Sequence, residues 1–215
     1  MANHAVLSAS ASHRWLNCPP SVRLTERIPD NGSIYAAEGS EAHELCEYKL
    51  RQLLGMEAHN PLDTPIGLRH YDGTMEDAAT GYAAFVLELL EEIRKTCSDP
   101  IVMVEQKLDY SRWVKDGYGT GDAVIVADGA LHVVDFKYGT GVLVSAEGNS
   151  QMRLYALGAL DMFGELYDID TVVTTIYQPR LASISTDTIS KDDLLDWAEN
   201  TLRPLAEQAY KGEGD

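Results

Sequence analysis

Two β-branched runs separated by one tight turn constrain the fold of this chain more than any other feature. The runs "GDAVIVAD" and "ALHVVDFKY" are rich in valine, and Asp128-Gly129 between them is a strong hairpin signal. A third run of the same kind, "IVMVEQKLDY", precedes them. Residues 101–138 are therefore predicted to form three short consecutive strands.

Helical patterns lie on both sides of these strands. "SASASHRWLNCPP" predicts a short helix over about residues 10–17, with hydroxyl residues as its N-cap and prolines that end it. "IYAAEGSEAHELCEYKLRQLLG" has apolar residues at helical spacing, and "TMEDAATGYAAFVLELLEEIRKTC" opens with a Thr-x-x-Asp capping pattern. After the strands come a helix in "NSQMRLYALGALDMFG", strands in "IDTVVTTIYQPR" and "ASISTDTI", and a closing helix capped by Ser190.

This order predicts an α/β fold, more specifically an α+β arrangement with a central mixed sheet flanked by helices. We expect a single domain over residues 1–215. Its parts are a helical region over 1–100, the sheet core over 101–188 and the closing helix over 190–215.

Composition indicates the expected cellular compartment and binding partners of the chain. The formal net charge is −17, from 34 acidic and 17 basic residues. This charge opposes non-specific binding to phosphate groups. No apolar run approaches the roughly 20 residues that span a bilayer, and the N-terminus lacks the pattern of a signal peptide. Three widely spaced cysteines favour a reducing compartment, so we expect a cytoplasmic protein with no membrane partner.

The third strand carries two charged residues where a buried strand is expected. Asp135 and Lys137 lie two apart and share a face, and Asp122 on the preceding strand lies at a comparable distance from the turn. Two neighbouring carboxylates repel unless a cation lies between them, and Mg²⁺ or Mn²⁺ suits such oxygen ligands. The glycines of "GYGTG" before Asp122 allow a sharp turn or a close ligand. A purely structural Asp135–Lys137 ion pair is the alternative.

These motifs resemble those of a known superfamily. "GTGDAVIV…LHVVDFKYG" is similar to the metal-binding hairpin of the PD-(D/E)XK nucleases, whose core has the order helix, three strands, helix, strand. "EGSEAHELCE" resembles the helix motif of the RecB-like exonuclease branch, and "EGNSQMRLYALG" resembles its Gln-x-x-x-Tyr motif. The sequence of the whole chain resembles the phage-encoded domain-of-unknown-function 2800 family, which is assigned to this superfamily by resemblance.

The resemblance implies a restriction-endonuclease-like core and a metal-dependent deoxyribonuclease. It implies a RecB-like exonuclease in phage replication or recombination, with DNA and the proteins of those processes as partners, in the host cytoplasm. The residues implied as ligands of Mg²⁺ or Mn²⁺ are His43, Asp122, Asp135, the backbone carbonyl of Phe136, and Glu105. Lys137 would orient water or stabilise charge, secured by Gln151 and Tyr155. Candidate phosphate contacts are Arg112, Lys115 and Arg153.

Further alternatives stay open from sequence. Relatives in the RecB-like branch often carry an iron-sulfur cluster, and Cys18-Pro19 resembles its first ligand. A cluster takes four thiolates, so only a longer form of the protein with three more cysteines would bind one. The nuclease fold could also be a non-catalytic module that binds DNA or a protein partner. A lysine-dependent carbonyl enzyme that uses Lys137 is a third interpretation.

Overall fold

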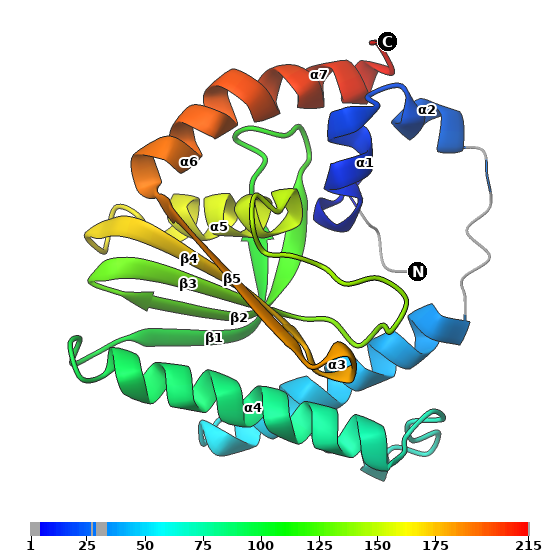
Figure 1. Ribbon diagram of the computed structural model, residues 1–215, viewed down its shortest axis with the longest axis vertical. Coiled ribbons are helices and arrows are strands. Elements are labelled where there is room, and N and C mark those ends of the chain that lie inside the picture. The colour runs from blue at the N-terminus through cyan, green and yellow to red at the C-terminus, as the bar shows by residue number, and fades with distance from the viewer. Residues whose placement is uncertain (1–4, 27, 29–33, 215) are drawn as a thin grey trace.

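The computed structural model describes residues 5–26, 28 and 34–214 (Figure 1). Residues 1–4, on which the signal-peptide prediction partly rests, lie outside this range. In chain order the elements are η1 (Ala9–Ala11), α1 (Ser12–Asn17), α2 (Ser21–Thr25), α3 (Ile34–Leu53), η2 (Pro61–Asp63), α4 (Gly73–Ile93), β1 (Ile101–Asp109), β2 (Tyr118–Ala127), β3 (Gly129–Phe136), α5 (Ser150–Phe163), β4 (Ile169–Gln178), η3 (Pro179–Leu181), β5 (Ser183–Ser190), α6 (Lys191–Trp197), the π-helix η4 (Ala198–Leu202) and α7 (Arg203–Lys211).

The five strands form one mixed sheet in the order β1-β2-β3-β4-β5. Neighbouring strands are antiparallel except β3 and β4, which are parallel and joined through α5. The predicted hairpin turn is confirmed, because Ala127 pairs with Ala130 and Gly129 has the positive φ of 86° that glycine tolerates. The fold is therefore the expected α/β class, a mixed sheet flanked by helices.

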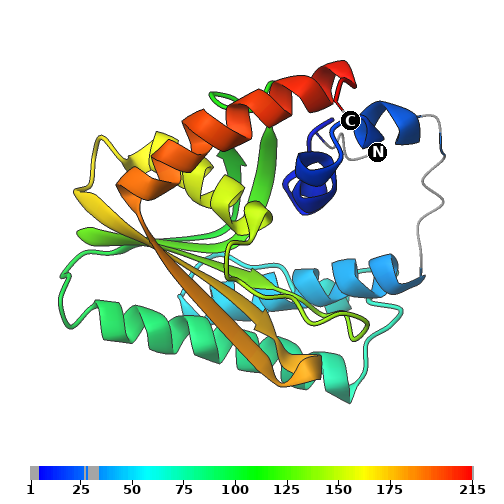
Figure 2. The same ribbon diagram turned by 45° about the horizontal axis from the view of Figure 1, so that its top comes forward.

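Helices cover both faces of the sheet, as Figures 1 and 2 show. On one face α3 and α4 pack against the inward side chains of the first three strands, which include Ala123, Ile125 and Phe136. On the other face α5 lies against the sheet, and α1, α6 and α7 pack over it. In the part of the chain that the structure describes, no helix combines the length and apolar character needed to cross a membrane.

The helix starts differ in part from the sequence prediction. Ser190 caps α6 as expected, since its hydroxyl accepts a hydrogen bond from the Asp193 amide. The N-cap of α4 is Asp72 rather than Thr74, because the Asp72 carboxylate accepts from the Met75 amide at 2.8 Å. Within the described residues, η1 and α1 begin without a side-chain cap, and the Ser12 hydroxyl pairs with Ser150 on α5 instead.

The β1–β2 hairpin changes direction halfway along its length. Glu105 has a left-handed φ of 53°, which is rare for a residue with a side chain. Val104 packs on the α3–α4 face, whereas Leu108 packs on the α5 face, although residues four apart share a face in a regular strand. The far half of the hairpin therefore rises beside α5, as Figure 2 shows. This bend positions the candidate site described below.

The glycines before Asp122 make room for aromatic rings, and one of them also lies in the turn that the sequence suggested. A Cβ on Gly119 would lie 2.6 Å from the Tyr155 ring, and one on Gly117 would lie 2.6 Å from the Tyr110 ring. These distances are too short for any side chain. Gly119 therefore admits the Tyr155 ring of α5. Gly117 admits the Tyr110 ring and also closes the turn between β1 and β2, because its amide donates to the Val114 carbonyl at 2.8 Å.

Candidate metal centre and the adjoining lysine

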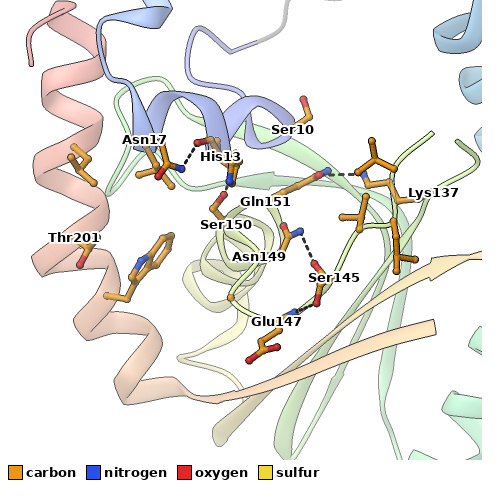
Figure 3. A pocket seen from close by; sticks show the side chains of 18 residues that line it. Ser10, His13, Asn17, Lys137, Ser145, Glu147, Asn149, Ser150, Gln151 and Thr201 are labelled. Atoms are coloured by element: carbon orange, nitrogen blue, oxygen red, sulfur yellow. Dashed lines mark hydrogen bonds between the residues drawn. The ribbon is translucent and has the colours of Figure 1, made fainter. Parts of the chain in front are cut away.

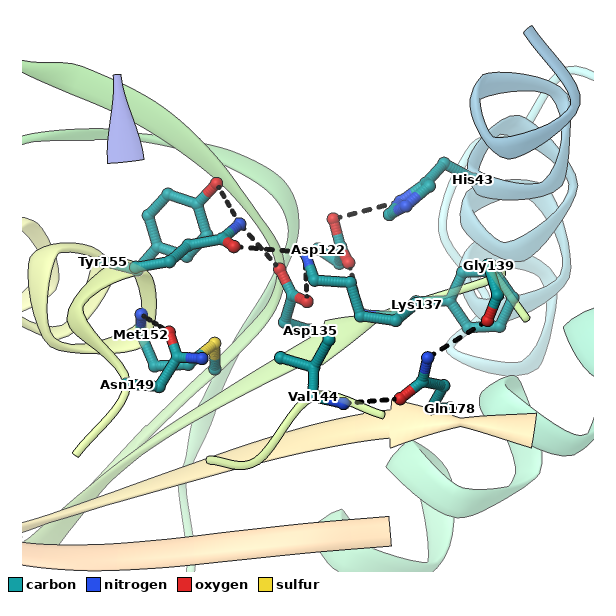
Figure 4. A network of polar contacts seen from close by, with 12 residues as sticks. His43, Asp122, Asp135, Lys137, Gly139, Val144, Asn149, Met152, Tyr155 and Gln178 are labelled. Carbon is teal, nitrogen blue, oxygen red and sulfur yellow. Dashed lines mark hydrogen bonds and ion pairs between the residues drawn. The ribbon is translucent and has the colours of Figure 1, made fainter. Parts of the chain in front are cut away.

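Three side chains from three elements converge at the bend of the hairpin. His43 comes from α3, Glu105 from β1 and Asp122 from β2, and one ligand atom of each lies within 4.8 Å of the other two. His43 Nδ1 lies 3.3 Å from Asp122 Oδ1, and Figure 4 shows the imidazole reaching from its helix toward that carboxylate. One imidazole and two carboxylates form a donor set that can hold a divalent metal ion. We call this group the triad.

Local packing sets the position of His43. The neighbouring α3 residues Ala42, Leu45 and Cys46 are buried in the apolar cluster with α4. His43 lies at the edge of that buried stripe, 34 % exposed, with its ring edge-on to Phe136 at 5.3 Å between centroids. The helix therefore holds the imidazole against the sheet while leaving part of it accessible to solvent.

Register and backbone conformation set the two carboxylates side by side. The pairs Val104–Ala123 and Gln106–Gly121 flank the bend, so Glu105 lies opposite Asp122 across the two strands. The left-handed backbone at Glu105 costs on the order of 1–2 kcal/mol for a residue with a side chain. A strained residue of this kind is typical of functional sites.

The electrostatics of the triad favour a bound proton or a bound cation. Burial raises the pKa of Glu105 to about 7, and the neighbouring charge of Asp122 acts in the same direction. Burial opposes protonation of His43, but the charge and hydrogen bond of Asp122 outweigh it and raise the His43 pKa to about 9. Without a metal ion, protons on these two side chains offset the concentrated negative charge.

Asp135 lies beside the triad in a separate polar network. Asp135 is 2 % exposed, and its Oδ2 lies 2.9 Å from Lys137 Nζ. Gln151 joins the two, because its amide nitrogen donates to Asp135 Oδ1 at 3.3 Å and its oxygen accepts from Lys137 Nζ at 3.2 Å. The same amide nitrogen lies 3.1 Å from the Tyr155 hydroxyl oxygen, to which it donates (Figure 4).

Burial and pairing act in opposite directions on this second network. Burial raises the pKa of Asp135, and the Lys137 ammonium reduces that rise. Burial lowers the pKa of Lys137, but Asp135 reverses the effect, so the net shift is upward. The amine is therefore a cation at neutral pH, fixed by a carboxylate and an amide oxygen.

Asp122 connects the triad to the strand that carries Asp135 and Lys137. The Phe136 amide donates to Asp122 Oδ2 at 2.6 Å. Phe136 thus contacts Asp122 through its N–H, and the role of its carbonyl as a metal ligand stays a prediction. One carboxylate oxygen of Asp122 faces His43, and the other is held by the backbone of β3.

The structure brings most of the predicted site residues together, but not all. His43, Glu105 and Asp122 form the triad, and Lys137, Gln151 and Tyr155 surround Asp135. Asp135 itself does not belong to the group of ligand atoms within 4.8 Å of one another.

The remaining candidates lie elsewhere. Arg112 pairs with Asp161, and Lys115 and Arg153 each lie over an aromatic ring, Tyr210 and Trp197 respectively. Cys18 is exposed after α1, whereas Cys46 and Cys97 are buried in the α3–α4 cluster.

Sequence reasoning missed Gln178 at the end of β4. Gln178 is 1 % exposed, and its side chain satisfies three backbone groups of the segment that follows Lys137. Its amide donates to the carbonyls of Gly139 (3.0 Å) and Val142 (2.8 Å), and its oxygen accepts from the Val144 amide (3.0 Å). Figure 4 shows the contacts with Gly139 and Val144. The signal available in the sequence was a side-chain amide directly before a proline at the end of a predicted strand.

Comparisons with known proteins place the chain in a family. A solved structure titled "Crystal structure of SSO0001" is 13 % identical, with 95 % of this chain and 87 % of that chain covered, at a TM-score of 0.33. A likeness at that TM-score carries no argument about fold or function. The model of the family described as "Protein of unknown function (DUF2800)" matches residues 4–215. The match spans nearly the whole chain, and the protein therefore belongs to this family.

Proposed function

We propose that this protein is a metal-dependent nuclease that hydrolyses phosphodiester bonds in DNA. The observation that carries the proposal is that the triad, from α3, β1 and β2, lies beside the Asp135–Lys137 pair at the end of β3. Two neighbouring carboxylates, an imidazole and a fixed ammonium suit the chemistry of a phosphodiester, which is anionic and gains charge during hydrolysis.

The proposal extends to the PD-(D/E)XK superfamily and its RecB-like exonuclease branch. The similarity of "GDAVIV", "VVDFKYG" and the His43 helix to the motifs of that branch supports it, and the mixed sheet is compatible with it. A role in phage replication or recombination, with the proteins of those processes as partners, rests on the resemblance of the sequence alone.

The donor set of the triad fits Mg²⁺ or Mn²⁺. A divalent ion held by His43, Glu105 and Asp122 would supply Lewis-acid stabilisation and lower the pKa of a coordinated water. Asp122 has a further role, because its second oxygen accepts from the Phe136 amide and so fixes the carboxylate in place.

The remaining residues act on the phosphate and on one another. Lys137 Nζ would donate to a phosphate oxygen or orient the attacking water, since Asp135 and Gln151 hold its ammonium group in one position. Gln151 is a positioning residue, because it contacts both members of the ion pair. Tyr155 accepts from the Gln151 amide and limits its rotation.

The test is cleavage of linear single- and double-stranded DNA with Mn²⁺. We would compare the wild type with Asp122→Asn, Lys137→Ala and the control Lys95→Ala, which removes an exposed lysine just after α4. The proposal expects cleavage by wild type and control, and loss of cleavage in the two site variants. Cleavage that is equal in all four proteins would refute it.

The alternative function is a module that binds DNA or a protein without chemistry. The net charge of −17 favours a basic protein as the partner of such a module. Calorimetry with Mn²⁺ separates the two cases. The nuclease requires uptake of Mn²⁺ at the carboxylates, so absence of Mn²⁺ uptake would support the non-catalytic module and exclude the nuclease.

A further inference from the structure

A cleft of about 800 Å³ opens beside Lys137 and Gln151, which line part of it. Its other walls come from α1, from residues 142–150 and from the C-terminal helices, as Figure 3 shows. The roles proposed above for the triad and the lysine make no use of this space. Cavities of this size are typical of small-molecule sites in proteins.

Hydrogen bonds between separate segments fix the walls of the cleft. The Ser12 hydroxyl on α1 lies 2.6 Å from the Ser150 hydroxyl on α5. The Asn149 side chain caps α5 by accepting from the Met152 amide, and it donates to the Ser145 carbonyl at 3.0 Å. Gln178 holds the other end of the same segment. The cleft is therefore formed before any ligand enters.

The chemistry of the lining distinguishes among ligands. Its polar groups are mainly hydroxyls and side-chain amides, and its charged side chains are Lys137 and Glu147, with one histidine, His13. The rest of the lining is apolar and includes the half-buried indole of Trp197, whose ring lies 5.2 Å from the Arg153 guanidinium. A phosphate would require more cations. A flat, uncharged group with several donors and acceptors, such as a nucleobase, matches this lining.

We propose that the cleft binds the base and sugar of one unpaired nucleotide next to the scissile phosphate. The placement of that phosphate at Lys137 rests on the proposed function, whereas the cleft and its lining do not. A base inside a duplex has both faces and its pairing edge occupied, so it cannot present them to an indole and to amide groups. The substrate class that follows is single-stranded DNA or an unpaired end.

The test measures binding of a fluorescently labelled oligodeoxythymidylate by anisotropy, at low salt with EDTA so that no cleavage occurs. Thr201 is exposed on η4 and lines the cleft, so Thr201→Trp fills the cleft without removing a core side chain. Gln208→Trp adds the same side chain on α7, outside the cleft, and is the matched control. We expect about tenfold weaker binding by Thr201→Trp and by Trp197→Leu, the scale of one lost base stack, and unchanged binding by the control.

Two outcomes would overturn the inference. One is equal affinity of wild type, Thr201→Trp and Trp197→Leu, with unfolding curves that show all three proteins folded. The other is binding of a blunt duplex at least as tight as binding of the single strand. The assay needs no metal, so its outcome is separate from that of the Mn²⁺ cleavage experiment. Single-strand binding through the cleft would stand even if cleavage failed, and the reverse also holds.

Discussion

Two acidic clusters lie close together in the sheet, and they differ in how their negative charge is compensated. Asp135 is nearly fully buried and has an ammonium group at 2.9 Å together with the Gln151 amide. Glu105 and Asp122 share one imidazole between them, and among the described residues Glu105 has no ion pair within 4.0 Å. The first cluster is balanced by the protein itself, whereas the second lacks a full counter-charge.

This difference indicates which cluster is the better candidate for binding a cation. A buried carboxylate that already has a cation gains little from a second one, and its role is then to hold the lysine. Within the described part of the chain Glu105 lacks such a partner, and burial together with the neighbouring Asp122 charge raises its pKa to about 7, so this side chain favours a bound proton or a bound cation. From this comparison we expect metal binding at the triad and a positioning role for Asp135, and each expectation can be tested alone.

Removing Lys137, the counter-charge of Asp135, should produce the largest change in the stability of the protein. We expect Lys137→Met to lower the free energy of unfolding by about 3 kcal/mol at pH 7.5, because it leaves a buried carboxylate unpaired. The loss should be smaller at pH 5, where Asp135, whose pKa burial raises, can take up a proton. Urea denaturation with EDTA measures it. Lys95→Met, which breaks an exposed pair with Glu92, should cost no more than about 0.5 kcal/mol, and a similar cost for both variants would contradict the comparison.

Metal affinity should distinguish the two clusters next. Asp122→Asn keeps an acceptor for the Phe136 amide but loses the charge, so we expect Mn²⁺ affinity to fall at least about 100-fold in calorimetry. Asp135→Asn should reduce affinity much less, and Asp128→Asn at the exposed hairpin turn should leave it unchanged. If Asp135→Asn abolishes Mn²⁺ binding as Asp122→Asn does, then Asp135 is a ligand, as the sequence resemblance implied.

The pH dependence of stability should reveal the unbalanced charge in the metal-free protein. The pKa of Glu105 is about 7 when folded, against an ordinary value of 4.5, so the folded state holds its proton more tightly than the unfolded state. Its contribution to stability is present below pH 4.5 and is lost as the pH rises through 7. The variant Glu105→Gln should therefore lose less stability than wild type between pH 5 and about 6, below the range of about 6.5 to 9 in which His43 affects stability. Identical slopes in urea denaturation would show that Glu105 is already ionised.

The smallest effect is the proton that a metal ion would displace from His43. The pKa of this imidazole is about 9 without metal, so at pH 8 most of the protein carries the proton, and a coordinating imidazole must lose it. Calorimetry of Mn²⁺ binding in two buffers of different ionisation enthalpy should report release of about one proton per ion. For His43→Gln the release should fall close to zero. Equal proton release by both proteins would place His43 outside the metal site.

Much of the fold could be predicted from local patterns. The β-branched runs and the Asp128-Gly129 turn specify the hairpin, because strand alternation and turn chemistry depend on adjacent residues. The start of α4 was misplaced by two residues, since Thr74 and Asp72 both suit a cap and only the path of the preceding loop decides between them. The helix α2 was missed because it follows two prolines and is short.

The candidate site was less accessible to sequence reasoning than the fold. Resemblance to motifs suggested that His43 and Asp122 lie together, which no local pattern predicts. The bend at Glu105 could not be foreseen, since a left-handed glutamate opposes its own backbone preference and is held there by packing on both faces of the sheet. Gln178 was missed because its partners lie in an irregular segment earlier in the chain. Whether the triad binds metal stays a prediction.

The origin of the triad in three separate elements has a consequence for folding. The β1–β2 hairpin can pair as soon as its own residues are available, but the helix that carries His43 must dock on the finished sheet before all three ligands meet. A chain in which α3 is undocked would present two carboxylates and no imidazole, a much weaker chelator. A cation would therefore bind tightly only to molecules in which α3 has docked, and it would stabilise the fully folded state relative to partly folded ones.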